Sequence, residues 1–167
     1  MKFYNLRFVF LSFILSFPLG AAGSLQVTET EKAISIRRGD LMVLTYHKAE
    51  VPPPEKADPI YKRSGFIHPL CAPNGEPVTG IHPADHYHHL GLWHAWVKTK
   101  HGKDAPDFWN LRGSTGRVRY VKTIVLHEGS DEDPAVGFVV EQEQVAYKGP
   151  DQNCLLYTSD AADDASS

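Results

Sequence analysis

The sequence predicts a mainly β protein, built as an antiparallel β-sandwich, from two observations. Apolar and β-branched runs occur on either side of a short turn at residues 33–37 and 41–46. Strict alternation of apolar and polar residues marks residues 118–126 and 136–140. No heptad pattern, internal repeat or amphipathic helix longer than three turns competes with these strands. We expect the second half of the sheets to lie beyond this chain.

The first two runs form one predicted unit. Residues 33–37 and 41–46 are joined by Arg38-Gly39-Asp40, a short glycine-containing connection of the hairpin type. Residues 51–59 then contain four prolines, which cannot donate ladder hydrogen bonds and favour extended, exposed chain. The sequence therefore predicts an antiparallel pair followed by a loop.

The later strands follow the same logic. Residues 65–70 predict a short strand, and Pro73-Asn74-Gly75 supplies the residues of a turn. The polar stretch 129–134 interrupts the alternating segments 118–126 and 136–140. These two segments are predicted to pair as a long hairpin.

The N-terminus has the order of zones found in signal peptides. Lys2 and Arg7 precede the apolar run 8–19, and small residues follow at 20–24. A membrane-spanning helix needs roughly 20 apolar residues, more than this run provides. We expect residues 1–23 to be a signal peptide, so the protein is predicted to be periplasmic or secreted, with no membrane attachment after cleavage.

The C-terminus has a different composition. Residues 154–164 resemble one reading frame of a sequencing adapter, and we expect residues 154–167 not to be native. Residues 24–153 then form the N-terminal part of one domain, in which Cys71 is the only cysteine. No disulfide can form within that part, although the predicted compartment is oxidising.

The charge pattern excludes one class of partner. The formal net charge is −3, and the basic residues are scattered among acidic ones. A protein that binds the phosphate backbone normally carries a basic patch or stripe. The sequence therefore predicts no nucleic-acid partner.

The chemistry is concentrated in residues 85–96. This stretch combines four imidazoles, a carboxylate and two indoles in twelve residues: Asp85, His86, His88, His89, Trp93, His94 and Trp96. Histidine is the side chain that titrates and binds metals near neutral pH. A predicted site therefore lies here.

Several separated motifs, at residues 61–70, 73–75, 78–79, 85–96 and 107–109, occur in the same order in the PmoA-like family of exported bacterial proteins. The chain resembles that family over roughly residues 43–149. Many members carry Asp-His-Pro-His-His-Arg where this chain has Tyr87 and Leu90. The resemblance implies an exported protein without a settled reaction, because the family's "methane oxygenase" label would require several membrane-spanning helices.

The histidines allow two functional hypotheses. On a strand, His86 and His88 would share one face and could chelate a divalent metal cofactor, with His68 or Asp85 completing the ligand set. The spacing from Gly80 to these histidines matches the opening of a cupin motif, but the expected Glu is absent. This hypothesis gives a metal-dependent enzyme of cupin or oxygenase type.

The other hypothesis is carbohydrate processing or binding, with a small molecule such as a sugar as the substrate. The pattern is similar to the galactose-mutarotase-like supersandwich, which implies proton transfer by His and carboxylate side chains. Candidate catalytic residues are His86, His88, Asp85 and His68. Candidate substrate-binding residues are Arg63, His89, Trp93, Trp96 and Trp109. Two structural alternatives remain open: the tryptophans at positions 93 and 96 as core residues, and Arg63 as an ion-pair partner.

Overall fold

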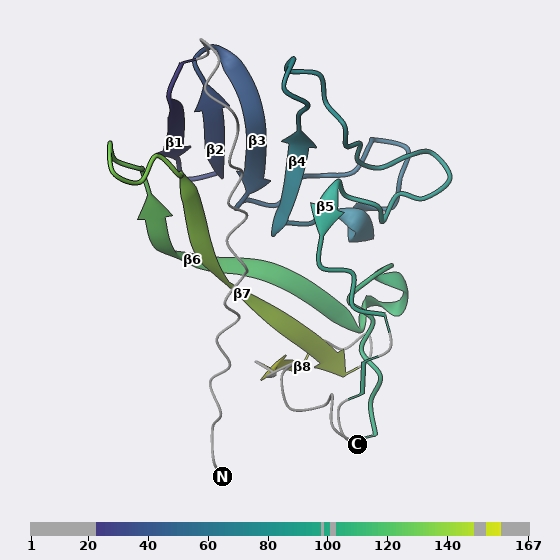
Figure 1. The fold of residues 1–167 in the computed structure, drawn as a ribbon. Coiled ribbons are helices and arrows are strands. Elements are labelled where there is room, and N and C mark those ends of the chain that lie inside the picture. Colours follow the sequence, from purple (N-terminus) through teal and green to yellow (C-terminus); the bar gives the residue numbers. More distant parts are fainter. Residues whose placement is uncertain (1–22, 98, 101–102, 149–152, 158–167) are drawn as a thin grey trace.

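Two antiparallel sheets make up the protein in a computed structural model that describes residues 23–97, 99–100, 103–148 and 153–157. Figure 1 shows the ribbon. The larger sheet has the strand order β1-β2-β3-β4-β5, formed by Leu25–Glu29, Ala33–Arg38, Leu41–His47, Phe66–Leu70 and Leu92–Trp93. The smaller sheet has the order β6-β7-β8, formed by Gly116–His127, Gly137–Lys148 and Asn153–Tyr157.

The predicted mainly β, antiparallel class is confirmed. The helical elements among the described residues are two short 3₁₀ turns, Pro59–Tyr61 and Arg112–Ser114. No helix in the described part of the chain is long and apolar enough to cross a membrane. The predicted signal peptide lies outside the described residues, apart from Gly23.

The hairpin predicted in the first sheet is confirmed. β2 and β3 pair antiparallel around Gly39, which has φ of +53°. Alternation explains why β2 forms, since Ile34 and Ile36 are buried while Ser35 between them is not. β1, which the sequence analysis did not predict, pairs with the outer edge of β2.

The long hairpin of the second sheet is confirmed and extends further than predicted. β6 and β7 pair from Gly116 opposite Ala146 to His127 opposite Gly137. The prediction ended the second strand at Val140, because four polar residues follow directly. Gln142 and Gln144 are nevertheless buried on β7, so the alternation continues with polar side chains.

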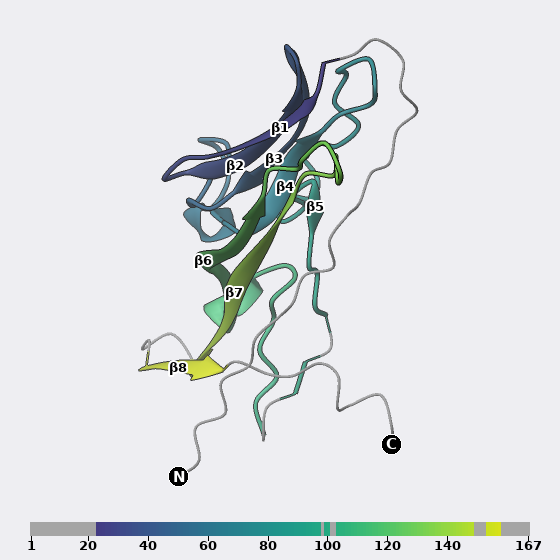
Figure 2. The ribbon, with the colours of Figure 1, turned by 60° about the vertical axis from the view of Figure 1, so that its left-hand side comes forward.

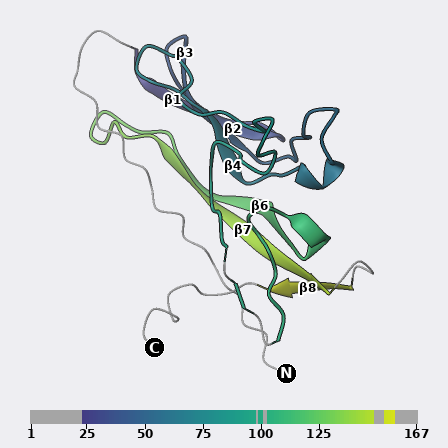
Figure 3. The same cartoon turned by 90° about the vertical axis from the view of Figure 1, so that its right-hand side faces the viewer.

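The core lies between the two sheets. Figure 3, which views them edge-on, shows the β6–β7 hairpin as a second layer against β1 to β4. The buried cluster takes residues from both layers: Val27, Ile34, Ile36, Tyr46, Val136 and Val140. Each such side chain stabilises the fold by about 1.5–3 kcal/mol when fully buried. This packing makes the fold a sandwich.

A polar contact joins the layers inside this core. The Gln142 Nε2 donates to the Tyr46 hydroxyl at 2.7 Å and to the Gly65 carbonyl at 3.0 Å. Burial raises the pKa of Tyr46, so its hydroxyl stays protonated. Gly65 has φ of +76°, and a Cβ there would lie 2.7 Å from Gln142 Nε2. The backbone approach therefore requires glycine.

A second, smaller core lies at the other end of the hairpin. Phe108, Val118 and Ala146 are buried together, and Trp96 packs against them. Figure 2 shows the chain after β5 running down beside β6 and β7 before it returns to β6. This cluster fastens the segment between β5 and β6, which carries Trp109, to the hairpin.

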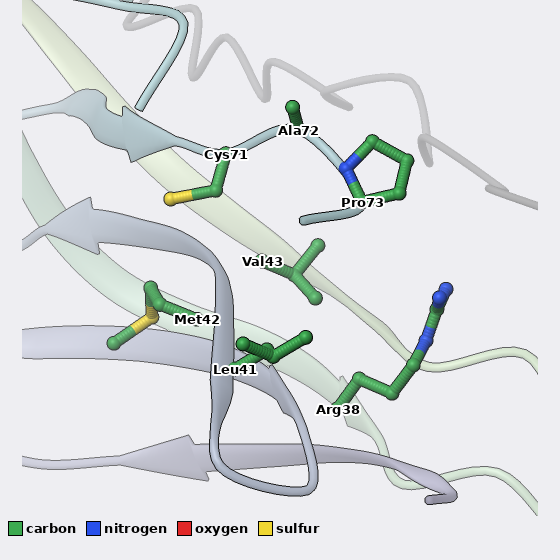
Figure 4. Close-up of a pocket in the computed structure, with 7 residues that line it drawn as sticks. All are labelled: Arg38, Leu41, Met42, Val43, Cys71, Ala72 and Pro73. Carbon is green, nitrogen blue, oxygen red and sulfur yellow. The ribbon is translucent and has the colours of Figure 1, made fainter. Parts of the chain in front are cut away.

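One pocket of the first sheet is too small to be a site. It has a volume of about 20 Å³ and lies between the β2–β3 turn and the chain after β4 (Figure 4). Its lining is Arg38, Leu41, Met42, Val43, Cys71, Ala72 and Pro73. That volume holds about one water molecule.

Candidate functional site

The histidine stretch forms a closed loop, residues 81–90, which we call the histidine loop. Ile81 and Leu90 pair at its base, and the His82 N–H donates to the His89 carbonyl at 2.8 Å. The side chain of Leu90 is 0% exposed. The ends of the loop are therefore held by backbone bonds and by one buried leucine.

Turns within the loop bring three imidazoles together. The His86 N–H donates to Pro83 and the His89 N–H donates to His86, both at 2.9 Å. Ring centroids lie 5.7 Å apart for His86 and His88, 4.9 Å for His86 and His89, and 4.4 Å for His88 and His89. The alternation considered for a strand, with His89 on the opposite face, does not occur because the stretch is a loop.

Two indoles stand against these imidazoles. Trp109 lies edge-on to His88, with centroids 5.1 Å apart, and is stacked at 6.4 Å from His89. Trp93, on β5, lies 5.6 Å from His89. The imidazole of His89 thus contacts both tryptophans, although these are far apart in the sequence.

The loop that carries Trp109 is fixed by a carboxylate. The Asp107 Oδ1 accepts hydrogen bonds from the backbone N–H groups of Trp109 at 2.9 Å and Asn110 at 3.1 Å. Leu111, which follows, is buried at φ of +61°. Asp107 is therefore a local cap that orients the indole.

An open groove of about 420 Å³ borders the cluster. It is lined by Val78, Thr79, Gly80, Ile81, Pro83, His89, Gly91 and Trp93. Its volume falls within the range of small-molecule sites, about 300–1,000 Å³. The groove thus combines an indole, an imidazole, a hydroxyl and two glycines.

His68 lies behind the groove wall. Its Nδ1 is hydrogen bonded to the Thr79 Oγ1 at 3.0 Å, and the same oxygen accepts from the Leu70 N–H at 3.0 Å. Burial lowers the pKa of His68, and the nearby His47 adds to this effect. His68 is thus connected to the groove through Thr79.

Asp85 lies on the outer rim of the loop. Its side chain is 78% exposed, and its Oδ2 lies 3.0 Å from the His86 Nδ1. The pKa of Asp85 is lowered, first by its own backbone N–H and then by the bond to His86. The pair forms a carboxylate–imidazole dyad open to solvent.

His88 is held in its neutral form. Partial burial lowers its pKa, and the neighbouring His89, His86 and Arg112 lower it further. Its Nε2 is buried and has no hydrogen-bond partner among the described residues. A neutral imidazole with an unused nitrogen can serve as a general base.

The described part of the chain assembles no three-residue metal site. Among the described residues, no group of three His, Cys, Asp or Glu side chains is arranged to hold a metal ion. The side chain of His68 contacts Thr79, while Asp85 pairs with His86. The predicted completion of a His86–His88 pair by either residue is not seen in this arrangement.

Arg63 lies behind the site and is only 1% exposed. Its Nη1 donates to the Phe108 carbonyl at 2.9 Å and its Nη2 to the His94 carbonyl at 3.3 Å. Burial lowers its pKa to about 10. These bonds to backbone carbonyls take the place of the ion pair considered from the sequence.

The tryptophans at positions 93 and 96 have different surroundings. Trp96 stacks on Phe108, with centroids 6.2 Å apart, and packs against the second core. Trp96 is therefore a core residue, the alternative that the sequence analysis left open for both tryptophans. Trp93 lines the groove instead.

Two residues of the site were not found from the sequence. His82 is buried, and its Nδ1 donates to the Tyr87 carbonyl at 2.5 Å, which supports the loop from inside. Thr79 joins His68 to the groove wall. His82 carries no signal of its own, and Thr79 was marked only as part of the motif at 78–79, because the role of each depends on a backbone path that only folding creates.

The fold and this cluster define an antiparallel β-sandwich with a histidine- and tryptophan-lined groove. The chain belongs to a family described as "Family of unknown function (DUF6807)", whose model matches residues 33–156. No curated protein and no solved structure matches the chain.

Proposed function

We propose that this protein is an exported carbohydrate-processing or carbohydrate-binding protein whose site is the groove beside the histidine loop. One observation carries the proposal. The imidazoles of His86, His88 and His89 lie together, and His88 and His89 contact the indoles of Trp93 and Trp109. His89 and Trp93 also line a groove of about 420 Å³.

The lining suits a sugar ring. A pyranose has an apolar face that packs on an indole and hydroxyls that need directional polar partners. Trp93 supplies the aromatic surface, while the Thr79 hydroxyl and the His89 imidazole supply polar groups. Gly80 presents backbone without a side chain, and a Cβ there would meet nothing within 4 Å, so a ligand can approach the main chain closely.

The histidines suit proton transfer at a sugar hydroxyl. Neutral His88 can accept a proton through an unprotonated ring nitrogen. His86, whose Nδ1 lies 3.0 Å from the Asp85 Oδ2, forms the other half of the exchange and can return a proton. Such an exchange needs no oxidant and no cofactor.

The N-terminal pattern supports a location outside the cytoplasm. A charged segment, an apolar run and small residues at 20–24 occur in the order of a signal peptide. A periplasmic or secreted protein meets free sugars and glycans directly. The resemblance to PmoA-like proteins supports export in the same way and adds no reaction.

The test measures binding and turnover separately. Protein beginning at Ser24 is titrated calorimetrically with D-glucose, D-galactose and D-xylose, and anomer exchange of each sugar is followed by NMR. Trp93→Ala should abolish binding, whereas Trp96→Phe, a change in the second core, should preserve it. An enzyme would lose turnover in His88→Gln and bind the sugar more weakly, because His88 contacts the ligand. Absence of binding and exchange with all three sugars would contradict the proposal.

The alternative is a metal-dependent enzyme that uses His86 and His88. The distance of 5.7 Å between their ring centroids favours it, because two imidazoles can approach one ion from such positions. A third ligand would then come from the substrate, from water or from a rearranged side chain. Metal analysis of purified wild type and His88→Ala separates the two candidates. A stoichiometric ion that only the wild type retains would favour the metal enzyme.

A further inference from the structure

We propose that Arg63 is a positioning residue that sets the distance between the two tryptophan walls of the site. This inference rests on the proposed function and deepens it. It assigns Arg63 a task different from direct substrate contact, because its side chain is 1% exposed.

The geometry places one guanidinium against the backbone next to both tryptophans. The Nη1 of Arg63 donates to the carbonyl of Phe108, the residue before Trp109. Its Nη2 donates to the carbonyl of His94, the residue after Trp93. A single planar group therefore holds the backbone next to each tryptophan, and the imidazole of His89 lies in contact with both rings.

The backbone of Arg63 is itself held in place. The Arg63 N–H donates to the Val51 carbonyl at 3.1 Å, and the Arg63 carbonyl accepts from the Val51 N–H at 2.8 Å. Gly65 and Phe66, which follow, are buried. The guanidinium thus extends from fixed backbone. It therefore limits where the two carbonyls that it binds can lie.

The burial of this charge needs a reason. A buried cation loses its hydration, and the hydrogen bonds that Arg63 donates to Phe108 and His94 end on backbone carbonyls, which carry no full charge. An apolar residue could fill the same space without that cost, but it could not satisfy two carbonyls of irregular chain. Lysine could not replace it either, since an ammonium lacks the planar fork that reaches two acceptors at fixed angles.

Arg117 offers a matched control. It too donates to backbone carbonyls, those of Lys62 at 3.1 Å and Ile60 at 3.5 Å, and it pairs with Glu50 at 3.1 Å. Its bonds hold a loop that carries no tryptophan. Replacing either arginine should therefore lower the stability of the protein. Only replacing Arg63 should also change the surroundings of the Trp93 and Trp109 indoles.

The experiment uses ¹⁹F NMR of the protein labelled with 5-fluorotryptophan. The three lines are assigned by replacing Trp93, Trp96 and Trp109 with Phe in turn. Arg63→Met and Arg63→Lys should shift or broaden the Trp93 and Trp109 lines at a temperature where both remain folded. Arg117→Met should leave those lines in place. If Arg63→Met does not fold, Arg63→Lys decides, because it keeps the charge and most of the aliphatic stem.

Sugar affinity is the second measurement. With D-galactose as the probe, both Arg63 variants should bind at least 10-fold more weakly than Arg117→Met. If the wild type binds no sugar, the proposed function fails, while the ¹⁹F comparison still decides the role of Arg63. Unchanged Trp93 and Trp109 lines in folded Arg63→Lys and Arg63→Met would overturn the inference.

Discussion

The imidazole of His88 meets the indole of Trp109 edge-on, with ring centroids 5.1 Å apart and planes at 87°. This contact orients an imidazole whose Nε2 is buried and has no partner among the described residues. A buried nitrogen without a partner normally costs stability, and under the proposed function we expect a ligand to supply that partner.

His88→Ala should therefore remove ligand handling while changing stability little. The side chain is only partly buried, and the loss of its aromatic contact should cost about 0.5–1.5 kcal/mol. Calorimetric titration with the sugar panel and thermal unfolding of the same sample measure both effects. Unchanged binding together with a loss of several degrees in Tm would make His88 a structural residue.

Leu90→Ala should be one of the most destabilising single changes in the histidine loop. Leu90 is 0% exposed and pairs with Ile81 at the base of the loop. Truncating a buried leucine to alanine costs about 2–5 kcal/mol. Urea unfolding should show this decrease, whereas Leu92→Ala on β5, where the residue is about half exposed (47%), should change stability by less than about 1 kcal/mol. Equal effects of the two substitutions would contradict the anchor role of Leu90.

The strands could be predicted because their signals are local. Alternation at residues 33–37 and 118–126 reports which face is buried, and turn residues such as Gly39 mark the ends. The far half of β7 was missed because its buried positions hold Gln142 and Gln144. Gln142 finds its partners on other elements, at Tyr46 and Gly65, and no local pattern records them.

The site could be predicted in composition but not in geometry. The histidine stretch was identified by its residues, yet its turns place three imidazoles together where a strand would separate them. Arg63 was selected as a ligand contact because of its charge. Its buried position depends on the carbonyls of His94 and Phe108, which approach it only after the chain folds.

The buried histidines predict a stability that falls on acidification. Burial lowers the pKa of His47 and His94 below the ordinary value of 6.5, so the unfolded state binds protons more readily than the folded state below that pH. The two neutral histidines contribute fully to the free energy of unfolding above about pH 6.5. This contribution is lost as the pH falls toward their pKa values in the folded protein. The pKa values of Glu29 and Asp85 are also lowered, but these carboxylates change the stability only below about pH 4.5.

Tm should therefore decrease between pH 7 and pH 5. His94→Gln should flatten this decrease, because glutamine has no proton to gain in that range. The measurement is thermal unfolding by circular dichroism at constant ionic strength. A Tm that rises toward pH 5, or an unchanged slope in His94→Gln, would contradict the assignment.

Gly91 and Gly39 provide a matched pair for the last prediction. Both have positive φ, +55° and +53°, so alanine at either position carries the same backbone strain of about 1 kcal/mol. A Cβ at Gly39 would meet nothing within 4 Å, whereas one at Gly91 would lie 2.2 Å from the Ile67 carbonyl oxygen. Contact at that distance forces β4 and the chain after the histidine loop apart.

Gly91→Ala should therefore cost well over the roughly 1 kcal/mol expected for Gly39→Ala, and it should also weaken ligand binding. Gly91 lines the groove directly before β5, and a shift there moves Trp93 away from His89. Urea unfolding and sugar titration of both variants compare the two positions, with Gly39→Ala expected to bind as the wild type does. Equal stability and equal binding in the two variants would show that the close approach of Gly91 to Ile67 does not hold the groove in shape.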